Sequence, residues 1–222
     1  EHLMKVMDLL KSKGIPFGYS VVANHNNVKE ITSDKFVDLM INKGAYLGFY
    51  LLYMPIGKDP DLRMMPTPKQ RKYLLERGRE IRNTKPLFFV DFWNDAPFMQ
   101  GCIAGRHYLH VNCAGDVEPC IFVHFAKDNI KDKSLKEILD SDFFRALRKR
   151  QPYKENLFTP CLIIDNPDVL KEISEKINIK PTHKDADNLF GELKPGIEKY
   201  AKELDKVYKP IWEDFKRQKN SK

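Results

Sequence analysis

Hydrophobic and polar positions over residues 1–94 alternate between a helical and an extended period. Apolar side chains three or four positions apart predict helices, and short runs of continuously apolar residues predict strands between them. The helices are expected to begin at residue 1, near Ser33 and at Thr67, and the strands to cover residues 17–23, 46–53 and 87–93. Strands this apolar usually have both faces covered, so the alternating order predicts parallel strands joined by helical crossovers.

The ends of these helices carry capping signals. Thr67 can cap the third helix, Pro68 suits its first position, and Gln70 completes a capping box. Gly44 is expected to end the second helix. The predicted class is therefore α/β. Three such units make half of a (β/α) barrel or part of an open sheet, so we expect the remaining strands in sequence that this chain lacks.

The pattern changes after Asn94. Residues 108–111 and 117–122 predict a β-hairpin that turns at Ala114 and Gly115. Further helices are expected from Ser134, which opens a second capping box, over 141–150 and from 166.

A long apolar stripe marks the end of the chain. Residues 194–219 predict a helix, kinked at Pro210, that docks on the protein. The sequence thus predicts three parts, which are a partial barrel at 1–94, a small domain of hairpin and helices at 95–165, and a helical extension at 166–222.

Composition indicates a globular protein. The chain has 222 residues, of which 42% are hydrophobic and 31% charged, enough for a substantial core. No apolar run approaches the roughly 20 residues that span a bilayer, and the first residues lack the flanks of a signal peptide. We therefore expect a soluble, cytoplasmic protein with no transmembrane segment. In that reducing compartment, four cysteines are better interpreted as metal ligands or buried thiols than as a disulfide scaffold.

Charge adds little to this picture. The net charge is +7, but lysines and arginines alternate with acids along most predicted helices. Only Arg145–Arg150 forms a dense basic run. Solvated helix faces explain this pattern better than phosphate contacts do, so no nucleic-acid partner is expected.

Three cysteines have a spacing that can bring thiolates together. Twelve residues separate Cys102 from Gly115, and four more separate Gly115 from Cys120. A hairpin turning at Gly115 would return the second thiol beside the first, and Cys161 could reach the pair from a later segment. Thiolates converging from separate segments are the ligands that iron-sulfur clusters require.

The spacing alone leaves alternatives open. A zinc site could use the same three cysteines with His107, His110 or His124, and the thiols could equally be buried without a metal. Cys113 would pair with Asp116 and lie four rungs from Cys120, about 13 Å at about 3.3 Å per residue, so we expect it to be a bystander. That leaves one cluster position for substrate, water, or a side chain such as His107, His124 or Asp165.

The motifs around these cysteines resemble those of a known family. Gly101-Cys102, then Gly115-Asp116-Val117-Glu118-Pro119-Cys120, Asn129-Ile130, Ser134-Leu135 and Pro160-Cys161 occur in the order found in the SPASM and shorter twitch domains of radical S-adenosylmethionine (SAM) enzymes. The resemblance covers roughly residues 95–165 and implies one auxiliary 4Fe–4S cluster on Cys102, Cys120 and Cys161. A much weaker resemblance links the earlier strands to the radical SAM partial barrel.

The chain departs from this family in two ways. The further cysteine run of a full SPASM domain is absent after Cys120, and position 164 is Ile, which implies a single cluster with an open coordination site. No Cys-x3-Cys-x2-Cys motif occurs, although the family uses it to hold the cluster that cleaves SAM. The resemblance therefore implies that SAM and a second 4Fe–4S cluster belong to a missing N-terminal half or a partner chain.

The resemblance also implies roles for other residues. SAM contacts would fall on Asn24, Tyr53 and Met54 at strand ends, although each can be merely a strand-end residue. Substrate contacts would fall on Arg106, Tyr108, His110 and His124, for which hairpin packing is the plainer interpretation. It names no catalytic residue in this chain.

Two functions follow as expectations. One is a radical SAM oxidoreductase or carbon-carbon bond-forming enzyme, acting on a peptide, small metabolite or lipid with an electron donor such as ferredoxin or flavodoxin. The other is a non-enzymatic metal-binding or electron-transfer module that acts with a partner chain.

Overall fold

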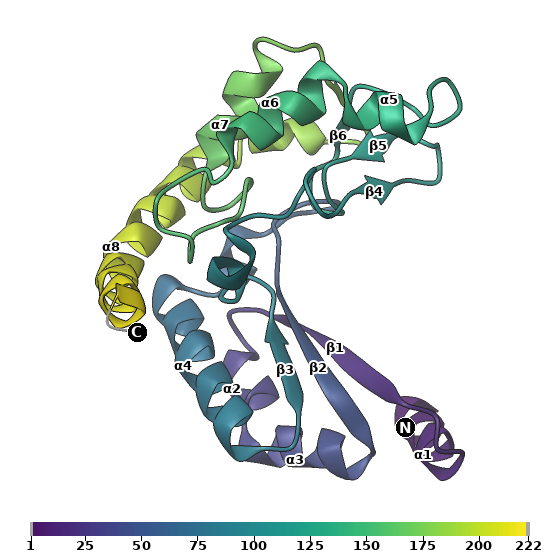
Figure 1. Cartoon of the computed structure of the whole chain (residues 1–222), viewed down its shortest axis with the longest axis vertical. Coiled ribbons are helices and arrows are strands. Elements are labelled where there is room, and N and C mark those ends of the chain that lie inside the picture. Colours follow the sequence, from purple (N-terminus) through teal and green to yellow (C-terminus); the bar gives the residue numbers. More distant parts are fainter. Residues whose placement is uncertain (1, 221–222) are drawn as a thin grey trace. The chain divides into compact units, whose positions relative to one another are not determined.

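The computed structural model describes residues 2–220, which belong to two compact units (Figure 1). Unit 1 contains the residues up to Tyr53 together with Arg63–Asp95. Unit 2 contains Met54–Leu62 and the chain from Ala96 onward. The loop 54–62 thus belongs with the later part of the chain. The three-part division expected from the sequence stays a prediction.

Unit 1 is a mixed α/β structure built on a three-stranded parallel sheet in the order β1-β2-β3. Its elements are α1 (His2–Ser12), β1 (Phe17–Ala23), α2 (Val28–Ile31), α3 (Asp34–Asn42), β2 (Ala45–Leu52), α4 (Pro68–Thr84) and β3 (Phe88–Asp91). The short 3-10 turn η1 (Leu62–Met64) lies at the boundary, with Leu62 in unit 2 and the other two residues in unit 1. The three parallel strands and their crossovers are confirmed. The sheet does not close, so the partial barrel stays a prediction.

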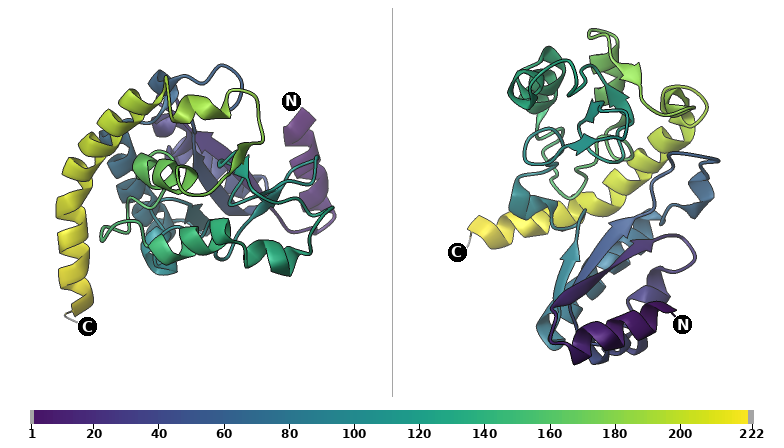
Figure 2. Two further views of the ribbon diagram at one scale, coloured as in Figure 1. Left: turned by 90° about the horizontal axis from the view of Figure 1, so that it is seen from above. Right: turned by 90° about the vertical axis from the view of Figure 1, so that its right-hand side faces the viewer.

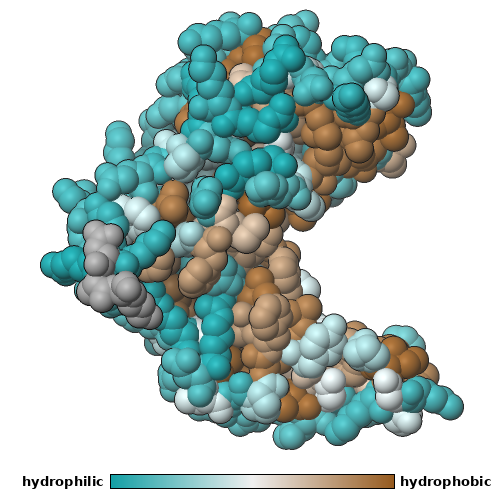
Figure 3. All heavy atoms as spheres, viewed as in Figure 1, coloured by the Kyte–Doolittle hydropathy of each residue, from teal (hydrophilic) through white to brown (hydrophobic). Residues whose placement is uncertain are grey.

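The two faces of the sheet differ. Helices α2, α3 and α4 pack on one face, where Tyr50, Leu52 and Phe89 are buried (Figure 1). On the other face Val22 is 46% exposed and Phe88 69% exposed, and apolar side chains are visible over the strands of unit 1 in Figure 3. The expectation that both faces are covered is wrong within this unit, because α2, α3 and α4 all lie against the same face.

Helix α4 lies close against the sheet. The capping box of Thr67 and Gln70 is present, as predicted. A Cβ added at Gly78 would lie 2.8 Å from the ring of Phe89, so the glycine allows the helix and β3 to approach. Leu74 and Ile81 flank it on the buried face of α4.

A buried polar group follows β3 at the carboxyl end of the sheet. The Asn94 side chain donates to Asp91 Oδ2 (2.5 Å), and the backbone N–H of Asp91 donates to Asp95 Oδ2 (2.9 Å). Arg82 in turn forms an ion pair with Asp95 at 2.6 Å. Burial raises the pKa of Asp91 to about 6 from 3.8, and the nearby charge of Asp95 also raises it.

This pKa shift predicts an unusual pH dependence. Because the folded state holds the Asp91 proton more tightly, its stabilising effect is complete below pH 3.8 and is lost as the pH rises through about 6. Lowering the pH from 7 to 4 should therefore stabilise the wild type relative to Asp91→Asn by about 2 kcal/mol. Urea unfolding followed by fluorescence of the buried Trp93 measures this. A pH-independent difference would contradict it.

Unit 2 is built from short elements. They are η2 (Ala96–Met99), β4 (His110–Val111), β5 (Val117–Glu118), β6 (Phe125–Ala126), α5 (Leu135–Leu139), α6 (Asp142–Arg150), α7 (Pro167–Ser174), β7 (Lys180–Pro181), η3 (Ala186–Leu189) and α8 (Lys194–Asn220). Strands β4 and β5 form the predicted hairpin, and the second capping box, at Ser134 and Glu137, is also present. The antiparallel pair β6–β7 was not predicted.

Helix α8 continues through Pro210 and appears as one long helix in Figure 2. Its predicted stripe packs inside unit 2, where Ile197, Leu204 and Tyr208 are fully buried. The ring centroids of Phe158 and Phe215 lie 5.4 Å apart, so Phe158 packs against the later turns of α8. The prediction that this stripe docks on the protein is confirmed.

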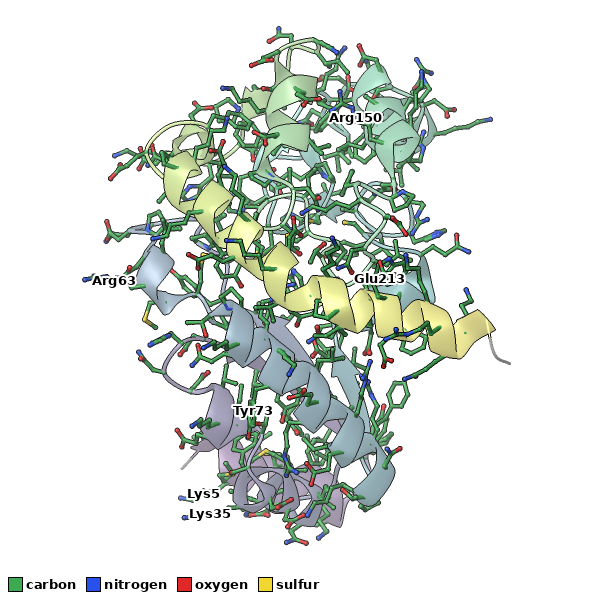
Figure 4. All side chains as sticks on the ribbon, turned by 90° about the vertical axis from the view of Figure 1, so that its left-hand side faces the viewer. Lys5, Lys35, Arg63, Tyr73, Arg150 and Glu213 are labelled. Atoms are coloured by element: carbon green, nitrogen blue, oxygen red, sulfur yellow. The ribbon has the colours of Figure 1, made fainter. Side chains whose placement is uncertain are left out.

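The basic run Arg145–Arg150 has partners inside unit 2. Arg150, labelled in Figure 4, forms a 2.7 Å ion pair with Glu172 of α7. Arg148 donates to the backbone carbonyl of Leu139 at 2.6 Å. These contacts support a structural role for both arginines. Within residues 2–220, none of the helices combines the length and apolar character needed to cross a membrane.

Candidate metal centre

The hairpin between Cys102 and Cys120 turns as the sequence predicts, with one correction. His110 pairs with Glu118, and the backbone N–H of Asn112 donates to Asp116 O at 3.1 Å. Asp116 thus faces Asn112 and not Cys113, because the turn holds three residues (113–115) and not two. Cys113 remains at the exposed tip, and its assignment as a bystander stays a prediction.

Gly115 is needed for this turn. Its φ of +91° lies in the left-handed region that favours glycine, and an added Cβ would lie 2.7 Å from Asn129 Oδ1. The Asn129 side chain donates to Ala114 O and to Asp116 Oδ1, both at 3.1 Å. These hydrogen bonds therefore fix the turn to the segment at Asn129.

Backbone N–H groups lie near the sulfur of each candidate cysteine and help to lower the pKa of its thiol. They are those of Ala104 and Leu162 at Cys102, of Phe122 and Val123 at Cys120, and of Ile163 and Ile164 at Cys161. Cys161 O accepts hydrogen bonds from the backbone of Asp165 (3.2 Å) and Asn166 (3.0 Å), which closes the loop before α7. Leu162, the neighbour of Cys161 in sequence, is thus also a neighbour of Cys102.

The three thiols influence one another electrostatically. Burial raises the pKa of Cys102 to about 11 and that of Cys120 to about 12, and it raises that of Cys161 further. The charge of Cys102 contributes to the raised pKa of both other thiols. Cys120 and Cys161 therefore each lie within electrostatic range of Cys102. At neutral pH they keep their protons unless a metal displaces them.

The donor set fits an iron-sulfur cluster in its chemistry. Cluster irons are held by thiolates, and hydrogen bonds to the sulfurs tune the potential. Among residues 2–220, no three His, Cys, Asp or Glu side chains are placed to hold one metal ion. Because a four-iron cluster spans more space than one ion, its thiolates stand farther apart than the ligands of a single ion. The assignment of Cys102, Cys120 and Cys161 as ligands stays a prediction.

Asp165 lies beside this group of thiols. Its Oδ2 accepts the backbone N–H of Cys161 at 3.0 Å, and the residue is 1% exposed. Its charge helps to raise the pKa of both Cys161 and Cys102. Of the three side chains considered for the fourth cluster position, His107 is exposed and His124 contacts the Ile121 carbonyl at 3.1 Å.

The four predicted substrate contacts fall into two groups, one near the cysteines and one around a buried polar group. Arg106 donates to the carbonyls of Met99 (2.6 Å) and Cys102 (3.3 Å), so it braces the loop that carries the first thiol. Burial raises the pKa of Tyr108, and the charge of Cys120 raises it further. The backbone N–H of Gly105 lies within hydrogen-bond distance of both Tyr108 O (2.7 Å) and Pro119 O (3.0 Å), so Tyr108 lies near the segment that ends in Cys120. His110 and His124 belong to a separate polar group.

That polar group is centred on Glu118, which is 2% exposed. His110 Nδ1 lies 2.7 Å from Glu118 Oε2, and the Thr182 hydroxyl donates to Glu118 Oε1. The rings of His124 and His183 lie 5.2 Å apart. Sequence reasoning missed Glu118, Thr182 and His183, because only the β6–β7 pairing brings residues 182–183 to the hairpin.

The predicted SAM contacts lie at strand ends. Asn24 follows β1, and its Oδ1 accepts the backbone N–H groups of Asn26 (2.9 Å) and Asn27 (3.2 Å). The backbone N–H of Tyr53 donates to Ala23 O at 2.8 Å, at the same edge of the sheet. Met54 belongs to unit 2 and is 5% exposed. Their role in SAM binding stays a prediction.

Comparisons with known proteins agree with this site. Residues 102–162 match the family SPASM, described as an iron-sulfur cluster-binding domain. A protein named AdoMet-dependent heme synthase, from Oleidesulfovibrio alaskensis, is 23% identical over 180 residues. That alignment covers 69% of this chain and 46% of the relative, so the chain spans about half of the relative's length. Together the two findings support a SPASM-containing protein of the radical SAM family.

Proposed function

We propose that this chain holds one auxiliary 4Fe–4S cluster on Cys102, Cys120 and Cys161 and is the C-terminal portion of a radical SAM enzyme. The observation that carries the proposal is that three cysteines from separate segments of unit 2 lie close enough for the charge of Cys102 to raise the pKa of both Cys120 and Cys161. The match of the SPASM family to residues 102–162 supports it independently.

The chain's own residues would prepare the site for the cluster. Backbone N–H groups at each sulfur favour the thiolate form, Asp165 fixes the Cys161 loop, and Arg106 fixes the Cys102 loop. When bound, such a cluster supplies electron transfer or an open iron that can hold substrate. A fourth protein ligand is not required by this proposal.

The rest of the enzyme would come from the missing N-terminal half or from a partner chain. It would supply SAM binding and the second 4Fe–4S cluster, with Asn24, Tyr53 and Met54 as contacts from this chain. Two observations support this. The alignment covers only 46% of the relative's length. The sheet of unit 1 has three strands, and one of its faces carries exposed apolar side chains. An external donor such as ferredoxin or flavodoxin would deliver electrons in the cytoplasm.

Substrate would be oriented near the hairpin. His110 and His124 are better candidates than Arg106, whose guanidinium already donates to two backbone carbonyls. Tyr108 lies toward Cys120 and could contact substrate at the cluster. We propose a polar group on the substrate, in a peptide, a small metabolite or a lipid, and an oxidation or carbon-carbon bond formation as the reaction.

A second candidate is a non-enzymatic electron-transfer module that works with a partner chain. The absence of a Cys-x3-Cys-x2-Cys motif from the sequence favours it. The upstream reading frame of the gene separates the two candidates. An in-frame motif there would support the enzyme, and a stop codon without one would support the module.

Anaerobic reconstitution tests the cluster itself. The purified chain should take up about four irons and four sulfides, as expected for one 4Fe–4S cluster. Iron and sulfide are counted by chemical analysis, and the reduced cluster is identified by electron paramagnetic resonance. Uptake of one zinc in place of iron and sulfide would contradict the proposal.

A further inference from the structure

The segment after α6 packs against the loop that begins at Cys102. A Cβ added at Gly101 would lie 3.3 Å from Pro152 Cβ, so the two backbones approach closely. The Gln151 side chain donates from Nε2 to Ala104 O at 2.7 Å. Ala104 lies two residues after Cys102, and its backbone N–H helps to lower the pKa of that thiol. Two separate contacts therefore hold residues 151–153 beside the first thiol.

The Gln151 amide orients the hydroxyl of Tyr153. A carbonyl oxygen only accepts hydrogen bonds, so the amide group that faces Ala104 O must be the NH₂. The same nitrogen donates to Tyr153 Oη at 3.2 Å. The phenol oxygen thus acts as an acceptor toward Gln151, and its own hydrogen must point in another direction.

The loop that begins at Cys102 is the neighbour of this phenol, because the Gln151 amide links the Tyr153 hydroxyl to Ala104 O, two residues after Cys102. Burial raises the pKa of Tyr153, and the charges of Cys102, Cys120 and Cys161 also help to raise it. A phenol is neutral at neutral pH, so Tyr153 keeps the hydrogen that it can donate. A neutral O–H group beside an anionic centre is a hydrogen-bond donor to that centre.

We propose that the Tyr153 hydroxyl, oriented by Gln151, donates a hydrogen bond to the cluster held by the three cysteines and thereby favours its reduced form. Reduction adds negative charge to the cluster, and a fixed O–H donor stabilises that charge. Tyr153 is then a tuning residue and not a ligand. This inference rests on the proposed function, because it requires a cluster on these thiols.

The test is Tyr153→Phe in the full chain, reconstituted anaerobically and titrated under electron paramagnetic resonance. The variant should keep the iron and sulfide content of the wild type. Its midpoint potential should fall by about 59 mV, which corresponds to a tenfold change for a one-electron couple. Tyr208→Phe is the matched control, since it removes another buried phenol from unit 2 and should leave the potential unchanged.

Gln151→Leu separates tuning from a packing effect. Gln151→Leu should also lower the midpoint potential of the cluster. The double variant with Tyr153→Phe should have the same midpoint potential as Tyr153→Phe alone. An unchanged potential in Tyr153→Phe, a loss of cluster in that variant alone, or fully additive shifts would each overturn the inference. A wild-type chain that takes up no iron and sulfide would overturn the proposed function, and this inference with it.

Discussion

Replacing Cys161 with Ala should abolish uptake of iron and sulfide, whereas Cys113→Ala should leave uptake at the wild-type level. Cys161 supplies one of three thiols that interact electrostatically, and its neighbour Leu162 lies near Cys102. Cys113 lies at the exposed tip of the hairpin. Removing one of three ligands leaves two irons of the cluster without a protein thiolate, whereas removing a bystander removes none.

Both variants are compared after identical anaerobic reconstitution, by iron and sulfide analysis per chain. Far-ultraviolet circular dichroism before reconstitution shows whether Cys161→Ala has folded, and Cys102→Ala should repeat its loss. Equal losses in Cys161→Ala and Cys113→Ala would refute the three-ligand assignment.

Replacing Gly115 with Ala should destabilise unit 2 by about 2–4 kcal/mol. The left-handed backbone costs a non-glycine residue about 1–2 kcal/mol. The new Cβ would also lie 2.7 Å from Asn129 Oδ1, and moving Asn129 breaks its hydrogen bonds to Ala114 and Asp116, at about 1 kcal/mol or more. The hairpin that carries Cys120 would loosen together with the turn.

Gly57→Ala is the matched control for Gly115→Ala. Gly57 also belongs to unit 2 and has a φ of +81°, but a Cβ there would meet nothing within 4 Å. It should cost only the backbone strain of about 1–2 kcal/mol. Urea unfolding is followed by Trp212 fluorescence in a Trp93→Phe background, which reports on unit 2. Equal destabilisation by the two substitutions would show that the contact with Asn129 contributes nothing.

The sequence alone determined the elements that depend on local chemistry. The strand at Phe17–Ala23 has the predicted bounds, and the capping boxes at Thr67 and Ser134 are both present. Hydrophobic periodicity and cap residues act within a few positions along the chain, so they can be recognised without knowing the fold. The cysteine motif was equally readable, because its spacing and its glycine follow from a hairpin.

The tertiary structure decided what surrounds the cysteines. Only the packing of Pro152 near Gly101 puts Tyr153 beside the loop that begins at Cys102, and only the β6–β7 pair takes Thr182 to Glu118. Strands of two residues carry no periodic signal, and the hairpin register changed by one residue with the length of its turn. Contacts between segments far apart in sequence depend on how the whole unit packs, and no local pattern along the chain records that packing.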